Sequence, residues 1–213
     1  PRCFSFDIIT VYRDDIEAEA SGQLSTVDKD GVESPFYRIK YSQDGHLTQL
    51  YDRRLGKDML SAVGGNLLTL YEDRPLDFNN WNIDANYPAK ATPLHADRIV
   101  VTANTGTHTD VTFNYHFGHS AIEQVMRLYA DSPRIDFITT VDWHQRQELL
   151  RTAFNTNILA DNAQYDIQYG NVSRPTNDNT SWDTAKFETV AHKWADLSEP
   201  DYRLALLNNC KYG

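Results

Sequence analysis

Apolar and polar side chains alternate with a period of two along most of the chain, whereas the period of an α-helix is nearly absent. In residues 108–117, every second residue from Val111 to Phe117 is apolar and the residues between them are mostly polar, as expected for a half-buried strand. The pattern continues in residues 120–130 and 135–141 after short breaks. We therefore expect three consecutive antiparallel strands joined by short turns.

A hairpin is predicted upstream, where residues 36–41 and 46–51 flank the pair Asp44-Gly45. Asp-Gly suits the positive φ that a tight hairpin turn requires. Further strands are expected at 4–12, 66–71, 98–103, 148–155, 165–169, 186–190 and 203–208. So many short strands favour two packed sheets over one open sheet, and we expect an all-β fold, a large antiparallel β-sandwich with almost no helix.

Domain organisation follows from a change in composition near residue 34. Residues 1–34 contain one predicted strand and an acidic stretch with few bulky apolar side chains, which indicates a small β-element and a connector. Residues 35–213 are then expected to form the main sandwich. With 12 Tyr, 9 Phe and 4 Trp, the chain has enough apolar material for a core without a disulfide framework.

The formal net charge of −10 argues against a nucleic-acid partner, which requires clustered Lys and Arg. No apolar run reaches the roughly 20 residues of a membrane helix, and no signal peptide opens the chain. Cys3 and Cys210 are far apart in sequence, and two cysteines are more often free thiols in a reducing compartment. These features favour a cytoplasmic protein without a membrane partner.

Candidate catalytic groups are weak. Asp136 and Asp142 share a strand face, but acids on the solvent side of a sheet are common, so we interpret them as structural. His108 and His116 would be roughly 26 Å apart on an extended strand, which is too far for one metal ion. We therefore predict no catalytic residue and no metal site in this chain.

Two long polar stretches, residues 73–93 and 170–185, are stronger candidates for function, because loops beyond about 12 residues are uncommon without a role. Each contains a Trp among side chains that can bond hydroxyl groups. The candidate site residues are Trp81, Asp84, Arg174, Asn179, Trp182 and Asp183. They predict either a sugar-contacting surface or an interface with another domain, and we favour the interface because interfaces are enriched in Trp and Arg.

Several sequence blocks occur in a fixed order in the second half of the chain: YADSPRIDF, VDWHQR, RPTNDNTSWD, HKWADLSEP and LLNNCKYG. Together with the upstream DRP and WNID segments, they resemble the C-terminal β-domain of glycoside hydrolase family 38, the retaining, zinc-dependent α-mannosidases. The resemblance extends from about residue 34 onward and is closest to the cytosolic or bacterial type.

The resemblance implies a large supersandwich of the galactose-mutarotase type, packed against an α/β catalytic domain. It also implies that the zinc ligands and the nucleophile belong to that catalytic domain, that the sandwich is incomplete at its C-terminus, and that the isolated fragment is inactive. The expected partners are the enzyme's own N-terminal catalytic domain and mannose-containing glycans, and a homo-oligomer of the full-length enzyme is left open. Two alternatives are a stand-alone carbohydrate-binding sandwich and a mutarotase-like enzyme with a His and an acid as base and acid.

Overall fold

A computed structural model describes residues 23–78 and 81–209, and in this part of the chain every strand pairing is antiparallel. The strands form four sheets. The first sheet has the order β1-β2-β3-β4-β5. Its strands are Thr26–Asp28, Gly31–Glu33, Tyr37–Tyr41, Leu47–Asp52 and Lys57–Asp58. The all-β prediction is confirmed.

The hairpin between β3 and β4 turns at Gly45, as predicted. Gly45 has a φ of +86°, a conformation that glycine adopts without strain. The turn is closed by the backbone N–H of Ser42, which donates to the carbonyl oxygen of His46 at 2.8 Å. A Cβ at Gly45 would lie 2.5 Å from the hydroxyl oxygen of Tyr115, so close packing as well as backbone conformation requires glycine here.

The second sheet has the order β11-β10-β9-β8 and contains the predicted meander. Its strands, in chain order from β8 to β11, are Arg98–Asn104, His108–Phe117, Ser120–Tyr129 and Ile135–Asp142. The apolar face predicted for β9 is buried, since Val111, Phe113 and Tyr115 are all fully buried, but Asp110 and Thr112 on the opposite face are buried too, so the strand is more than half-buried. The three-stranded meander is therefore confirmed.

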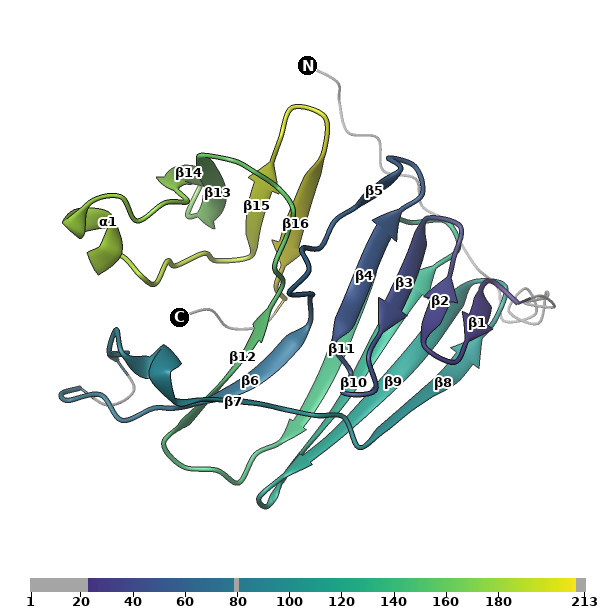
Figure 1. Cartoon of the computed structure of the whole chain (residues 1–213), viewed down its shortest axis with the longest axis horizontal. Helices are drawn as coiled ribbons and strands as arrows, with labels where there is room; N and C mark the ends of the chain where they lie inside the picture. Colours follow the sequence, from purple (N-terminus) through teal and green to yellow (C-terminus); the bar gives the residue numbers. More distant parts are fainter. Residues whose placement is uncertain (1–22, 79–80, 210–213) are drawn as a thin grey trace.

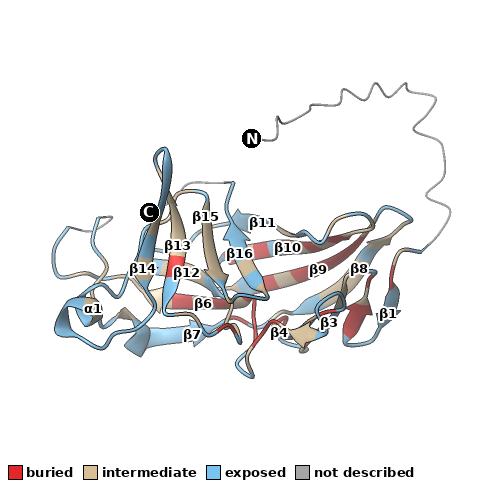
Figure 2. Cartoon of the chain, turned by 90° about the horizontal axis from the view of Figure 1, so that it is seen from above, coloured by how far each residue is buried: buried red, intermediate tan, exposed pale blue. Residues whose placement is uncertain are grey.

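The first two sheets pack face to face and enclose the main core (Figure 1). The rings of Tyr41 on β3 and Phe113 on β9 meet edge to face, with centroids 5.6 Å apart. Buried residues follow β9 and β10 along much of their length (Figure 2). Met126 and Leu128 of β10 and Ile39 of β3 complete this layer, so side chains from both inner faces hold the sandwich together.

Two smaller sheets extend the molecule at one end. One has the order β12-β6-β7 and the other has the order β14-β13-β15-β16. Their strands, in the order of the two sheets, are Glu148–Ala153, Leu67–Glu72, Ala91–Pro93, Gly170–Pro175, Asn162–Ile167, Trp194–Ser198 and Arg203–Leu207. Lys57 of β5 joins the first sheet to the turn after β15, because its ammonium group lies 2.5 Å from the Asp201 carboxylate and 4.1 Å from the Tyr202 ring centroid.

Three expectations about the last third of the chain are wrong. Residues 186–190 form no strand, and β15 begins later, at Trp194. Residues 170–185 are not one long loop, since they contain β14 and a short helix, α1 (Ser181–Ala185). The strand expected at 165–169 ends at Ile167, because residues 168 and 169 form a two-residue hairpin turn with Tyr169 at a φ of +61°.

The described residues of the segment 73–93 are mainly irregular, as expected, but include a 3₁₀-helix, η2 (Tyr87–Lys90), and the short strand β7. The boundary expected between residues 34 and 35 falls between β2 and β3, which are hydrogen-bonded neighbours. The strand expected at 4–12 and both cysteines lie outside the described residues. No helix among the described residues is long and apolar enough to cross a membrane.

Candidate functional site

The first candidate segment, residues 73–93, projects three large apolar side chains into solvent. Leu76 is 90% exposed, Phe78 is 77% exposed and Trp81 is 92% exposed. The backbone is nevertheless organised, because the N–H of Trp81 donates to the carbonyl of Phe78 at 2.9 Å. Phe78 has a φ of +60°, a costly conformation for a bulky residue that is often found at functional sites. Leu76, Phe78 and Trp81 are thus three exposed apolar side chains in one segment, of which sequence reasoning found only Trp81.

Asp84 holds this loop in shape. Its carboxylate accepts a hydrogen bond from the backbone N–H of Leu76 at 3.1 Å, and its carbonyl accepts one from the N–H of Tyr87 at 3.0 Å. Asp84 therefore contacts Leu76 through its carboxylate and the start of η2 through its backbone carbonyl. Asp84 is thus engaged in contacts within its own segment.

The second candidate segment carries Trp182 on α1, where the side chain is 78% exposed. The helix begins after Thr180, whose hydroxyl oxygen accepts a hydrogen bond from the N–H of Asp183 at 3.2 Å. The same hydroxyl donates to the Asp183 carboxylate at 2.6 Å. Asp183 and Thr180 thus form a reciprocal cap, and the helix displays Trp182 on the surface.

Arg174 and Asn179 also make contacts within this part of the chain. The guanidinium of Arg174 donates to the carbonyl of Val190 at 2.6 Å and lies 5.2 Å from the ring centroid of Tyr165. The backbone N–H of Asn179 donates to the side-chain oxygen of Asn177 at 3.3 Å. These interactions fix the chain on both sides of α1.

The two candidate segments lie at the same end of the molecule, beyond β6, β7 and β12 (Figures 1 and 2). Contacts through Arg151 of β12 connect their flanks. Its guanidinium donates to the Tyr87 hydroxyl and to the Glu188 carboxylate. The ring of Tyr87 also lies near that of Phe187, with centroids 6.4 Å apart.

We call Tyr71, Tyr87, Arg151, Phe187 and Glu188 the Arg151 cluster. Sequence reasoning missed it, because its members come from four separate segments of the chain: β6, η2, β12 and the residues after α1. The one available signal was the apolar and charged pattern of residues 186–190, which we interpreted as a strand. In the structure, this pattern provides a ring and a carboxylate for the cluster instead.

The acids considered for catalysis have structural partners. Although burial by itself raises the pKa of the Asp136 carboxyl, hydrogen bonds from Arg134 at 2.5 Å and Tyr129 at 2.6 Å bring its pKa below the usual value. Asp142 lies on the surface, 3.0 Å from His144.

Two of the described histidines each lie beside an acidic side chain. His95 lies 3.0 Å from Asp44, and His116 lies 2.8 Å from Asp97. Among the residues that the structure describes, no three His, Cys, Asp or Glu side chains are grouped so that they could hold a metal ion.

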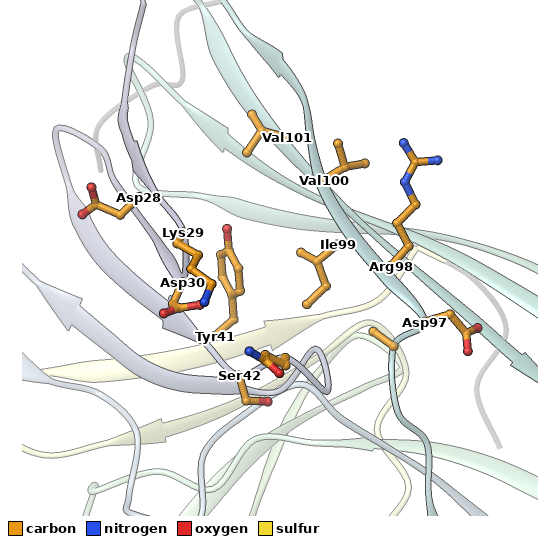
Figure 3. A pocket seen from close by; sticks show the side chains of 12 residues that line it. Asp28, Lys29, Asp30, Tyr41, Ser42, Asp97, Arg98, Ile99, Val100 and Val101 are labelled. Carbon is orange, nitrogen blue, oxygen red and sulfur yellow. The ribbon is translucent and has the colours of Figure 1, made fainter.

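A cavity of about 270 Å³ opens between the edges of the two main sheets (Figure 3). Tyr41 and Ile99 face each other across it, while Arg98 points away. Burial, together with Asp30 and Asp28, raises the pKa of Tyr41, so its hydroxyl is neutral at ordinary pH. The cavity lies at the end of the molecule opposite α1 and is separate from the candidate segments.

The described residues form an antiparallel β-domain with two exposed aromatic segments at one end. Comparison with protein families identifies it: residues 32–213 match the glycosyl hydrolases family 38 C-terminal domain, and the chain belongs to this family. It is 35% identical over 189 residues to alpha-mannosidase G of Dictyostelium discoideum and 33% identical over 186 residues to human alpha-mannosidase 2C1. Each match covers 85% of this chain, but only 17% and 18% of the two relatives. The chain therefore spans less than a fifth of their length.

A solved structure shares the fold. The crystal structure of an alpha-mannosidase from Enterococcus faecalis V583 aligns with a TM-score of 0.66 and 13% sequence identity. The alignment covers 84% of this chain and 23% of that chain. The recognised family and the architecture agree.

Proposed function

We propose that this chain is the C-terminal portion of a retaining, zinc-dependent α-mannosidase that removes α-linked mannose from glycans. Its role is to support the catalytic domain and to form part of the wall of the substrate cleft. The observation that carries the proposal is family membership over residues 32–213, in a chain that spans only 17–18% of its alpha-mannosidase relatives. Most of such an enzyme, including its catalytic groups, would lie outside these residues.

The exposed side chains support docking onto a protein more than binding of a free sugar. A sugar site needs polar side chains free to bond hydroxyl groups beside its aromatic platform. Here Asp84, Arg174 and Asp183 are already engaged within their own segments. The neighbours of Trp81, Leu76 and Phe78, add aliphatic and aromatic surface, which suits the apolar core of an interface.

Zinc is expected in the catalytic domain, and no residue of this chain is assigned to it. An open zinc site uses three protein ligands, and no such group of His, Cys, Asp or Glu occurs among the residues that the structure describes. We also propose that the enzyme acts in the cytoplasm on mannose-containing glycans.

Direct sugar contact is the second candidate role, favoured by the 92% exposure of Trp81. In this role, Trp81 would line the cleft formed jointly with the catalytic domain. It differs from the stand-alone sugar-binding alternative, in which the isolated chain would bind a mannoside by itself.

The test compares the full-length polypeptide with a version that lacks this chain. We expect the full-length protein to hydrolyse an aryl α-mannoside, and the truncated protein to lose most of that activity. A truncated protein that remains folded and fully active would contradict the supporting role. Titration of mannose onto the isolated chain, followed by calorimetry, separates the stand-alone binding module from the docking domain.

A further inference from the structure

Arg151 occupies a central position between two segments that are far apart in sequence. It lies on β12, opposite Thr69 of β6 in the antiparallel register. Its guanidinium donates to the hydroxyl of Tyr87, which follows the exposed apolar loop. It also donates to both carboxylate oxygens of Glu188, which follows α1, with the second contact at 3.2 Å. One side chain thus contacts the flank of each candidate segment.

Aromatic packing strengthens this connection. The Arg151 guanidinium carbon lies 5.1 Å from the ring centroid of Tyr87, within the range of a cation–π interaction. Tyr87 packs edge to face on Tyr71, with centroids 5.0 Å apart, and also lies near Phe187, with centroids 6.4 Å apart. The ring of Tyr87 is therefore held by β6, β12 and the segment after α1 together.

The electrostatics of the cluster favour the ion pair. The side chains of Arg151 and Glu188 are 36% and 33% exposed, so both are partly withdrawn from water. Burial by itself lowers the pKa of Arg151, but the Glu188 carboxylate outweighs this effect and brings the pKa above its usual value. Arginine suits the position because its planar group can contact two partners at once, which the single ammonium of lysine does less well.

We propose that Arg151 is a positioning residue that joins the loop bearing Trp81 and the helix bearing Trp182 into one composite docking surface. Its partner is the catalytic domain of the same enzyme, so the inference rests on the proposed function. The choice of partner follows from the large apolar side chains exposed at this end and from the 17–18% share of the relatives that the chain spans. A loop and a helix held together in this way lose less conformational entropy on docking than two independent segments.

The test is peptide-resolved hydrogen–deuterium exchange on the full-length polypeptide with Arg151→Met and Glu188→Ala. Glu188→Ala is the more decisive variant, because the substitution lies in the segment after α1 but should also speed exchange in the loop that bears Trp81, which is distant in sequence. We expect exchange to become about tenfold faster in both 73–90 and 176–190, since each variant removes charge-assisted hydrogen bonds. Arg151→Lys should give intermediate rates.

The matched control is Arg38→Met. Arg38 also pairs with a glutamate, Glu33, at 3.4 Å and lies 5.5 Å from the ring centroid of Tyr51, but in the first sheet. The Arg38→Met substitution should leave the exchange rates of both candidate segments unchanged. If Glu188→Ala accelerates exchange only in its own segment, the two segments are independent and the inference is wrong.

Activity distinguishes the inference from the function on which it rests. We expect Arg151→Met to lower kcat/KM for an aryl α-mannoside about fivefold. The double variant Arg151→Met with Trp81→Ala should have nearly the same kcat/KM as Arg151→Met alone, because both substitutions disturb one surface. Coupled exchange together with unchanged kcat/KM in every variant would confirm the coupling of the segments but overturn docking onto the catalytic domain.

Discussion

Replacing Trp81 by Ala should affect the full-length enzyme much more than the isolated chain. In the isolated chain Trp81 is 92% exposed, so little of its surface is removed from water. At about 25 cal/mol per Å², the small covered area corresponds to about 0.5 kcal/mol, or a change of about 1–2 °C in Tm. In the full-length enzyme, a buried Trp covers roughly 150–250 Å², which gives an upper limit of about 6 kcal/mol. Ordering costs reduce this value, and we expect a loss of about 1 kcal/mol or more.

The assay measures kcat/KM of the full-length enzyme and Tm of the isolated chain for the same substitutions. A loss of about 1 kcal/mol in transition-state binding lowers kcat/KM about fivefold. Trp182→Ala should behave similarly. Trp143→Ala is the control, because Trp143 is partly buried against Phe117, with ring centroids 5.7 Å apart, and its loss should destabilise both proteins by about 3 kcal/mol. If Trp81→Ala unfolds the isolated chain and spares full-length activity, the interface assignment is wrong.

Three further predictions concern the sandwich and its chemistry. Phe113→Ala should cost about 3–5 kcal/mol and lower Tm by about 10 °C, because Phe113 is fully buried between the main sheets; a shift below about 3 °C in thermal unfolding would contradict this. Burial raises the pKa of the Asp52 carboxyl, but hydrogen bonds from Arg54 and Leu55 outweigh this effect and bring its pKa below the usual value. The ionised carboxylate therefore stabilises the fold above about pH 4, and this stabilisation is lost as the pH falls through the lowered pKa. Asp52→Asn should therefore lower the free energy of unfolding by about 1 kcal/mol at pH 7, a value kept small because the Arg54 side chain is 45% exposed. Denaturant unfolding should show that the difference between the two proteins shrinks in acid, and a constant difference would contradict the prediction. The isolated chain should not hydrolyse an aryl α-mannoside with added zinc, because its catalytic groups are expected elsewhere; turnover that scales with chain concentration and survives repurification would refute this.

The main sandwich was largely predictable from the sequence because local signals and burial coincide there. In β9, the residues that alternate as apolar are the residues that fill the core, from Val111 to Tyr115. Gly45 marks a turn whose φ few other residues adopt. These features depend on side chains close together in sequence, which periodicity detects.

The last third was less predictable because tertiary contacts override the local pattern. The turn between β13 and β14 has Tyr169 at positive φ, where Gly or Asn is expected, so the hairpin carried no usual turn signal. Residues 186–190 alternate like a strand, yet Phe187 and Glu188 pack around Tyr87 and Arg151. Their partners are distant in sequence, and no spacing rule indicates them.

The candidate segments were recognised from length and composition, but their character required the structure. Trp81 and Trp182 were chosen from sequence, whereas Leu76 and Phe78 were not, because single apolar residues in a polar stretch carry no periodic signal. Asp84 and Asp183 were chosen as groups that could bond a sugar. In the structure, each carboxylate organises its own segment.

Hydroxyl-radical footprinting of Trp81 and Trp182 tests the central claim most directly, because it reports the exposure of each indole in the isolated chain and in the full-length enzyme. Trp143 serves as an internal reference in both proteins, since it is partly buried within this domain. We predict strong labelling of Trp81 and Trp182 in the isolated chain, in keeping with their 92% and 78% exposure, and labelling several-fold weaker in the full-length enzyme. Equal labelling in the two proteins, with the Trp143 reference unchanged, would contradict the claim that these segments dock onto the catalytic domain.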